Sequence, residues 1–174
     1  IAAHLRANRG INCDAEQIFI VGGAQQAFYL IGTMLLNPGD RVWFENPGAI
    51  GARNSLIATG ADLVPIPVDG QGLRVDEALR VSPQFRLAFV TPSHQQPLST
   101  VMSLERRFAL LHAAEQAGAW IIEDDYDGEV SFGGPPRQPS DRWLARDKAL
   151  HFTASAIIQS VGHSVLRANG RAYR

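Results

Sequence analysis

The sequence of 174 residues contains one cysteine, one lysine and no long apolar run. Because Cys13 is alone, it cannot form a disulfide within the chain, and a free thiol is typical of a reducing compartment. No apolar stretch is long enough to span a bilayer and no signal-peptide pattern is present, so we expect a cytoplasmic protein without membrane contacts. The net charge of −1 gives no sign of a surface for nucleic acids or acidic lipids.

The remaining composition is that of a globular domain, with 45% hydrophobic and 19% charged residues. This length and balance are enough for one domain with a hydrophobic core. The chain begins with Ile1 rather than methionine, and residues 1–5 have the pattern of the middle of a helix. We therefore expect a fragment of a longer protein.

Apolar runs alternate with segments of helical periodicity along the chain. The runs predict strands at 17–21, 41–44, 62–67, 86–90, 120–123 and 150–153. Helices are predicted between them, including an apolar stripe over 27–35, a helix at 51–59, and one that starts after Ser103 and ends at Gly118. This alternation predicts an α/β fold of three layers, α/β/α, with a mostly parallel sheet.

The segment 121–127 (IIEDDYD) is the most informative part of the sequence. It has the pattern of a buried strand that ends in carboxylates, and ligands bind at that end of the strands in open α/β sheets. Four acidic groups within five residues are costly unless a cation, a protonated ring or solvent offsets them. A carboxylate at Asp124 could keep a pyridine-like nitrogen protonated, and a phenol at Tyr126 could donate to an oxyanion. A solvated acidic loop and a Mg²⁺ site are the alternatives.

Two further loops follow predicted strands. Residues 22–25 (GGAQ) lead into a helix, which favours either a phosphate-binding turn or an ordinary strand–helix turn. Residues 91–97 (TPSHQQP) contain His94, which could orient a ligand or be an ordinary loop histidine.

These three loops, in this order, resemble the aminotransferase-like domain of MocR-type regulators, a branch of the GntR family. Residues 41–48 (RVWFENPG) resemble the strand and turn at the ring face of the cofactor in that family. The resemblance covers residues 1–153 as a partial large domain, and 154–174 are an atypical tail. It implies the fold type I of aspartate aminotransferase and pyridoxal 5′-phosphate as the cofactor.

By the same resemblance, Gly23, Ala24 and Gln25 would hold the cofactor phosphate. Asp124 would pair with the protonated ring nitrogen and Tyr126 would bond the phenolic oxygen of the ring. His94 would lie near the ring. The ligand would be an amino acid or amine, the intact parent would be a homodimer, and DNA would be bound only through a domain absent from this chain.

The sequence also departs from the family pattern. Ala49 stands where an aromatic residue often stacks on the cofactor, residues 97–99 (PLS) replace Pro-Thr-Gly, and Gly22 replaces a serine. The Schiff-base lysine is missing, with Ile157 or Ser160 in its place depending on the alignment. Because Lys148 is the only lysine and precedes the last predicted strand, no catalytic residue is assigned.

Four hypotheses follow from these observations. The first is a pyridoxal-phosphate-binding fragment of a MocR-type regulator, in which the cofactor acts as a sensor. The second is part of an active class I or II aminotransferase that acts on amino acids and 2-oxo acids. The third is a remnant without catalysis or ligand, and the fourth is a Mg²⁺-dependent phosphate enzyme built on Asp124, Asp125 and Asp127.

Overall fold

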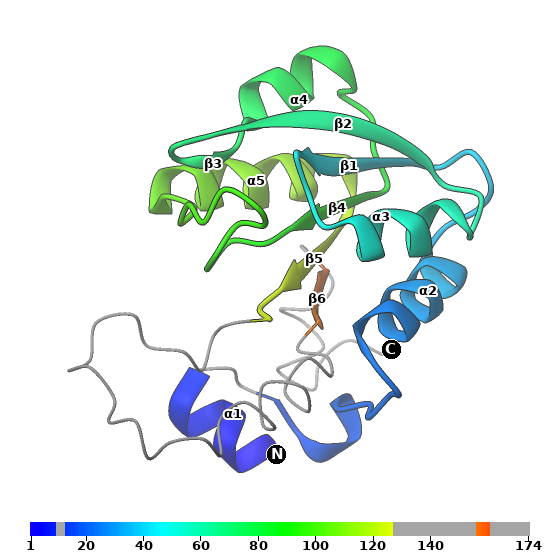
Figure 1. Ribbon diagram of the computed structural model, residues 1–174, viewed down its shortest axis with the longest axis vertical. Coiled ribbons are helices and arrows are strands. Elements are labelled where there is room, and N and C mark those ends of the chain that lie inside the picture. The colour runs from blue at the N-terminus through cyan, green and yellow to red at the C-terminus, as the bar shows by residue number, and fades with distance from the viewer. Residues whose placement is uncertain (10–12, 127–155, 161–174) are drawn as a thin grey trace.

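The computed structural model describes residues 1–9, 13–126 and 156–160, the last of these by backbone alone. Its centre is a six-stranded sheet with the order β3-β2-β1-β4-β5-β6 (Figure 1). Strands β2, β1, β4 and β5 run parallel, and the two end strands β3 and β6 are antiparallel to their neighbours. The predicted, mostly parallel sheet is confirmed.

Strand bounds agree with most of the predicted apolar runs. The strands are β1 (Arg41–Asn46), β2 (Asp62–Asp69), β3 (Gly72–Leu73), β4 (Leu87–Val90), β5 (Trp120–Asp124) and β6 (Ala156–Ser160). All four residues of β4 are buried, as expected of a central parallel strand covered on both faces. Strand β2 contains Pro65 and Pro67 and pairs with β3 only at Val68 and Asp69, so it is close to an edge strand.

Helices cover both faces of the sheet, which gives the predicted three layers. On one face, α2 (Ala24–Leu35) and α3 (Ile50–Ile57) enclose a core around Phe28, Phe44 and Phe89. On the other, α4 (Val75–Val81) and α5 (Leu104–Ala117) enclose a core around Trp43, Leu110 and Ile121. The short helices α1 (Ala2–Arg9) and η1 (Ala15–Gln17) precede this unit, and α1 lies away from the sheet (Figure 1).

The strand expected at 17–21 is wrong: residues 18–21 form no regular structure, and Phe19 and Ile20 are 84% and 82% exposed. A short apolar run becomes a strand only where a partner strand pairs with it, and none of the described strands does so here. The strand expected at 150–153 lies outside the described residues.

The ends of α5 show how local chemistry sets an element's bounds. The Ser103 side chain accepts a hydrogen bond from the Arg106 backbone N–H at 3.2 Å, which caps the helix start as predicted. At the other end Gly118 adopts φ 60°, a left-handed conformation that favours glycine and ends the helix. Strand β5 begins at Trp120, two residues after Gly118, and ends in the acidic segment at Asp124.

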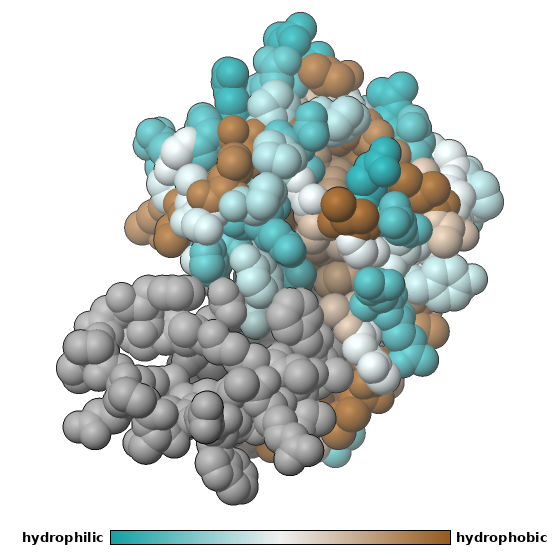
Figure 2. Space-filling model, in the orientation of Figure 1, coloured by the Kyte–Doolittle hydropathy of each residue, from teal (hydrophilic) through white to brown (hydrophobic). Residues whose placement is uncertain are grey.

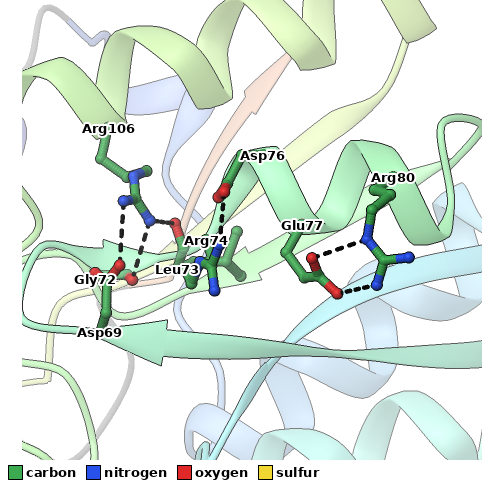
Figure 3. A network of polar contacts seen from close by, with 8 residues as sticks. All are labelled: Asp69, Gly72, Leu73, Arg74, Asp76, Glu77, Arg80 and Arg106. Atoms are coloured by element: carbon green, nitrogen blue, oxygen red, sulfur yellow. Dashed lines mark hydrogen bonds and ion pairs between the residues drawn. The ribbon is translucent and has the colours of Figure 1, made fainter.

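A polar network ties α5 to the β2–β3 hairpin (Figure 3). The Arg106 guanidinium donates to the Leu73 carbonyl oxygen at 2.7 Å and lies 3.3 Å from Asp69 Oδ2. The neighbouring pairs Arg74–Asp76 and Glu77–Arg80 have exposed members and contribute little to stability. Arg106 therefore fixes the start of α5 against the far edge of the sheet.

Some apolar side chains of the helices face solvent. Leu30 and Met34 of the predicted stripe on α2 are exposed, whereas Phe28 of the same helix is buried. The face seen in Figure 2 has separate apolar areas among hydrophilic residues. In the described part of the chain, no helix has the length and apolar character needed to cross a membrane.

Candidate functional site

A cleft of about 690 Å³ opens at the carboxyl ends of the parallel strands. Four segments meet there: the start of α2, the turn between β1 and α3, the turn after β4, and the end of β5. Its lining residues are Gly22, Gly23, Ala24, Gln25, Gln26, Phe28, Gly48, Ala49, Ile50, Gly51, Ala52, Gln96, Pro97 and Asp124. The cleft therefore lies at the sheet edge where ligands bind in this fold class.

One wall of the cleft is the start of α2. The first helical hydrogen bond runs from the Ala27 N–H to the Gly23 carbonyl oxygen at 3.1 Å, so the preceding N–H groups of the helix have no partner within it. The Gln26 side chain accepts from the Gly22 N–H at 2.5 Å and steadies the turn from inside. A Cβ atom at Gly23 would meet no heavy atom within 4 Å, so the backbone is open to a ligand. This arrangement attracts an anion.

The opposite wall comes from the turn after β1. Here a Cβ atom at Gly51 would lie 2.9 Å from Gln25 Nε2, which shows that the Gln25 side chain crosses from α2 to the start of α3. Gly48 is equally restricted, since a Cβ atom there would lie 2.3 Å from the Glu45 carbonyl oxygen. Gly48, in the turn after β1, and Gly51, at the start of α3, both line the cleft, and neither position has room for a larger side chain.

Asp124 lies at the end of β5, on the face covered by α2 and α3. Side chains alternate along the strand, so Ile122 and Asp124 point to that face while Ile121 points to the core under α5. The Asp124 side chain lines the cleft although the residue is only 8% exposed.

Burial raises the pKa of Asp124 to about 7, and repulsion from Asp125 and Glu45 adds to the rise. Among the described residues, no arginine, lysine or hydrogen-bond donor contacts this carboxylate. Within the described part of the chain, the cleft therefore has an anion-attracting end and a buried carboxylate without a counter-charge.

The neighbouring acid Glu123 has a different environment. Burial raises its pKa, but the positive charge of Arg107 acts in the opposite direction. Arg107 in turn donates to the Pro92 carbonyl oxygen at 2.8 Å and the Met102 carbonyl oxygen at 3.2 Å, and so holds the loop after β4. The acidic cluster is thus divided, with Glu123 offset by a cation and Asp124 facing the cleft.

The profile of the family described as "Aminotransferase class I and II" matches residues 1–166. The chain belongs to this family. The probable rhizopine catabolism regulatory protein MocR of Rhizobium meliloti is 49% identical over 136 residues, which are 78% of this chain and 27% of that protein. The pyridoxine biosynthesis transcriptional regulator PdxR of Corynebacterium glutamicum is 36% identical over 159 residues, 91% of this chain and 34% of that one.

The solved structure of Pyrococcus horikoshii kynurenine aminotransferase, in complex with PMP, has a TM-score of 0.63 and 29% identity. That match covers 71% of this chain and 32% of the archaeal chain. The chain therefore spans about a third or less of each of these three proteins. The fold matches part of the class I and II aminotransferase fold, as the resemblance implied.

The structure brings most of the predicted site residues of this aminotransferase-like domain together. Gly23, Ala24, Gln25 and Asp124 line the same cleft. Strand β5 ends at Asp124, and Tyr126 lies in the turn that follows it. The His94 and Tyr126 rings stack on each other, with centroids 5.8 Å apart and planes at 21°. Neither ring is among the residues that line the cleft.

Strand β6 carries both positions considered for the missing lysine. Its backbone pairs Ile157 with Glu123 and Ser160 with Trp120. Ile157 is therefore at the cleft end of β5 and Ser160 at the opposite end. Lys148 and Asp127 lie outside the described residues, and the described chain holds no group of three or more His, Cys, Asp and Glu side chains suited to a metal ion.

Sequence reasoning missed a buried polar cluster beneath the cleft, formed by Glu45, Thr91 and Gln95. These residues are 2%, 0% and 1% exposed. The available signal was a glutamate at the end of an apolar strand, immediately before an Asn-Pro turn. Its partners are 46 and 50 residues away, so local periodicity could not identify them.

Proposed function

We propose that this chain is the cofactor-binding part of the aminotransferase-like domain of a MocR-type transcriptional regulator, and that it holds pyridoxal 5′-phosphate in the cleft. The observation that carries the proposal is the position of Asp124, a buried carboxylate that no cation of the described residues contacts, in the same cleft as the start of α2. A phosphorylated pyridinium has an anionic group at one end and a cation at the other. It therefore matches both ends of the cleft.

Each part of the cleft has a separate role in this proposal. The start of α2 at Gly23, Ala24 and Gln25 would bind the phosphate through backbone N–H groups. Asp124 would hold the proton on the ring nitrogen, and the bound cofactor would supply an electron sink. The rings of His94 and Tyr126 stack on each other and would approach the cofactor ring from beyond the residues that line the cleft. Ala49 forms a short side wall there.

The regulator is favoured over the aminotransferase by the degree of similarity. Identity is 49% to MocR of Rhizobium meliloti, above the 36% to an archaeal alanine:glyoxylate aminotransferase and the 29% to the kynurenine aminotransferase. In a regulator, binding of an amino acid or amine near the cofactor would shift a conformational equilibrium. The intact protein would be a homodimer whose affinity for DNA changes when this equilibrium shifts.

A binding titration tests the cofactor proposal. Pyridoxal 5′-phosphate is added to the purified chain and binding is followed by absorbance and by quenching of tryptophan fluorescence. We expect Asp124→Ala to weaken binding at least about tenfold, since a buried charge–charge contact is lost. Asp127→Ala, in the same acidic segment, should have a smaller effect. Equal effects of the two substitutions would contradict the assignment of the ring-nitrogen partner.

The second candidate, an active aminotransferase, is favoured by the family match and by the similarity to the kynurenine aminotransferase structure, and it requires an amine nucleophile. Lys148 is the only lysine of the 174 residues and precedes β6 in the sequence. We therefore expect no transamination by this chain with amino acid donors and 2-oxo acid acceptors. Measurable turnover that disappears in Lys148→Ala would support the aminotransferase instead.

A further inference from the structure

The carboxylate of Glu45 is buried at the end of β1 and accepts three hydrogen bonds. The Thr91 N–H donates to Oε1 at 3.2 Å, and the Thr91 hydroxyl donates to Oε2 at 2.6 Å. The Gln95 side-chain amide donates to Oε2 at 3.1 Å. All three bonds come from neutral donors in the segment that follows β4.

Gln95 extends this cluster to both turns that border the cleft. Its amide nitrogen lies 2.8 Å from the Pro47 carbonyl oxygen and 2.9 Å from that of Gln96. Its amide oxygen accepts from the Leu98 N–H at 3.0 Å. The lining residues Gly48, Gln96 and Pro97 belong to these two turns, so the cluster holds two parts of the cleft wall in one arrangement.

Glu45 also acts on the cleft through its charge. Burial is the largest cause of the raised pKa of Asp124, and repulsion from Asp125 and then from Glu45 adds to it. Burial raises the pKa of Glu45, and the hydrogen bonds from the neutral donors of Thr91 and Gln95 act in the opposite direction; no described cation contacts it. Arg107, the cation on the α5 side of β5, acts on Glu123.

We propose that Glu45 is a positioning residue: it holds the turns after β1 and β4 together, and its negative charge strengthens the attraction of Asp124 for a cation in the cleft. The proposal rests on the proposed function only for the identity of that cation, the protonated ring nitrogen. The hydrogen bonds and the repulsion exist without any ligand.

The test compares Glu45→Gln with Glu115→Gln, a matched change at an exposed position on α5. The first readout needs no ligand: the carboxyl carbon of Asp124 is titrated by NMR. We expect it to titrate in Glu45→Gln at a pH at least about 0.5 lower than in the parent, because one of two repelling charges is removed. No change is expected in Glu115→Gln.

The second readout is the dissociation constant for pyridoxal 5′-phosphate near pH 8. We expect Glu45→Gln to weaken binding about three- to tenfold, because Asp124 then faces the ring cation without the added negative charge. Thr91→Val keeps that charge but loses the 2.6 Å hydrogen bond, so it should weaken binding without lowering the pH at which Asp124 titrates.

The outcomes separate the two proposals. If Asp124 titrates alike in the parent and in Glu45→Gln, the role of Glu45 is refuted. If Asp124 titrates at a lower pH in Glu45→Gln but the unsubstituted chain binds no pyridoxal 5′-phosphate, the electrostatic role of Glu45 is supported and the proposed function fails. If Glu45→Gln does not fold, Thr91→Val decides: binding equal to that of the parent would refute the positioning role.

Discussion

The substitution Asp124→Asn tests the electrostatics of the cleft without any ligand. Burial and two neighbouring carboxylates raise the pKa of Asp124 from its ordinary value of 3.8 to about 7. The folded chain therefore holds a proton at Asp124 between these pH values, whereas the unfolded chain has released it. Because the folded state binds more protons, the free energy of unfolding falls as the pH rises through this window, and the destabilisation is complete above pH 7.

The magnitude follows from the same two pKa values. At 1.36 kcal/mol for each tenfold change in proton affinity, a rise from 3.8 to about 7 corresponds to at most about 4 kcal/mol. Relaxation around the carboxylate and partial contact with solvent reduce this, so we expect D124N to be about 1–3 kcal/mol more stable than the parent at about pH 8.5. At about pH 4 the two chains should be equally stable, since neither carries the buried charge.

The assay is urea unfolding followed by tryptophan fluorescence at both pH values, in the parent, D124N and Asp62→Asn. Asp62 is exposed at the start of β2, so its substitution should change stability by less than about 0.5 kcal/mol at either pH. A D124N chain that gains no stability at the higher pH would refute the view that Asp124 is a buried carboxylate whose charge is costly in the folded state. The same substitution should weaken cofactor binding, which separates stability from function at this position.

Two other substitutions test the packing that supports the cleft. Gly48→Ala should lower the free energy of unfolding by about 1–3 kcal/mol, because its Cβ atom would lie 2.3 Å from the Glu45 carbonyl oxygen. Gly70→Ala is the control, since a Cβ atom there meets no heavy atom within 4 Å, and equal urea midpoints for the two variants would contradict the steric argument. Ser103→Ala should cost about 1 kcal/mol in the same assay, because the 3.2 Å cap of α5 is lost. Rescue by Ser103→Asp and not by Ser103→Val would identify capping as the cause.

Much of the fold was predictable because burial on two faces leaves a clear pattern. The buried parts of β1, β4 and β5 are apolar except for Glu45 and Asp124 near the strand ends, and Ser103 and Gly118 mark the ends of α5. The run at 17–21 has the same composition but forms no strand, since pairing depends on a neighbour that the local sequence does not specify. Strand β3, with only two residues, is too short to leave a periodic pattern.

The candidate site was predictable in part. Its glycine turn, histidine loop and acidic segment each follow a predicted element, and the order of the three segments led to the aminotransferase-like family. The different environments of the carboxylates within the acidic segment were not predictable. Glu123 and Asp124 are adjacent and both acidic, yet one lies near Arg107 and the other near Glu45.

The amino-acid sequence alone indicated which segments are buried, where several of them end, and which residue types lie at those ends. Folding established which ends are neighbours. Glu45, Thr91 and Asp124 come from β1, the segment after β4, and β5, which are adjacent only because the sheet has the order β1-β4-β5. Alternation and helical periodicity report the environment of a side chain, but they carry no information about which distant strand lies beside it. The environment of the Asp124 carboxylate therefore depends in part on residues that are distant in the sequence.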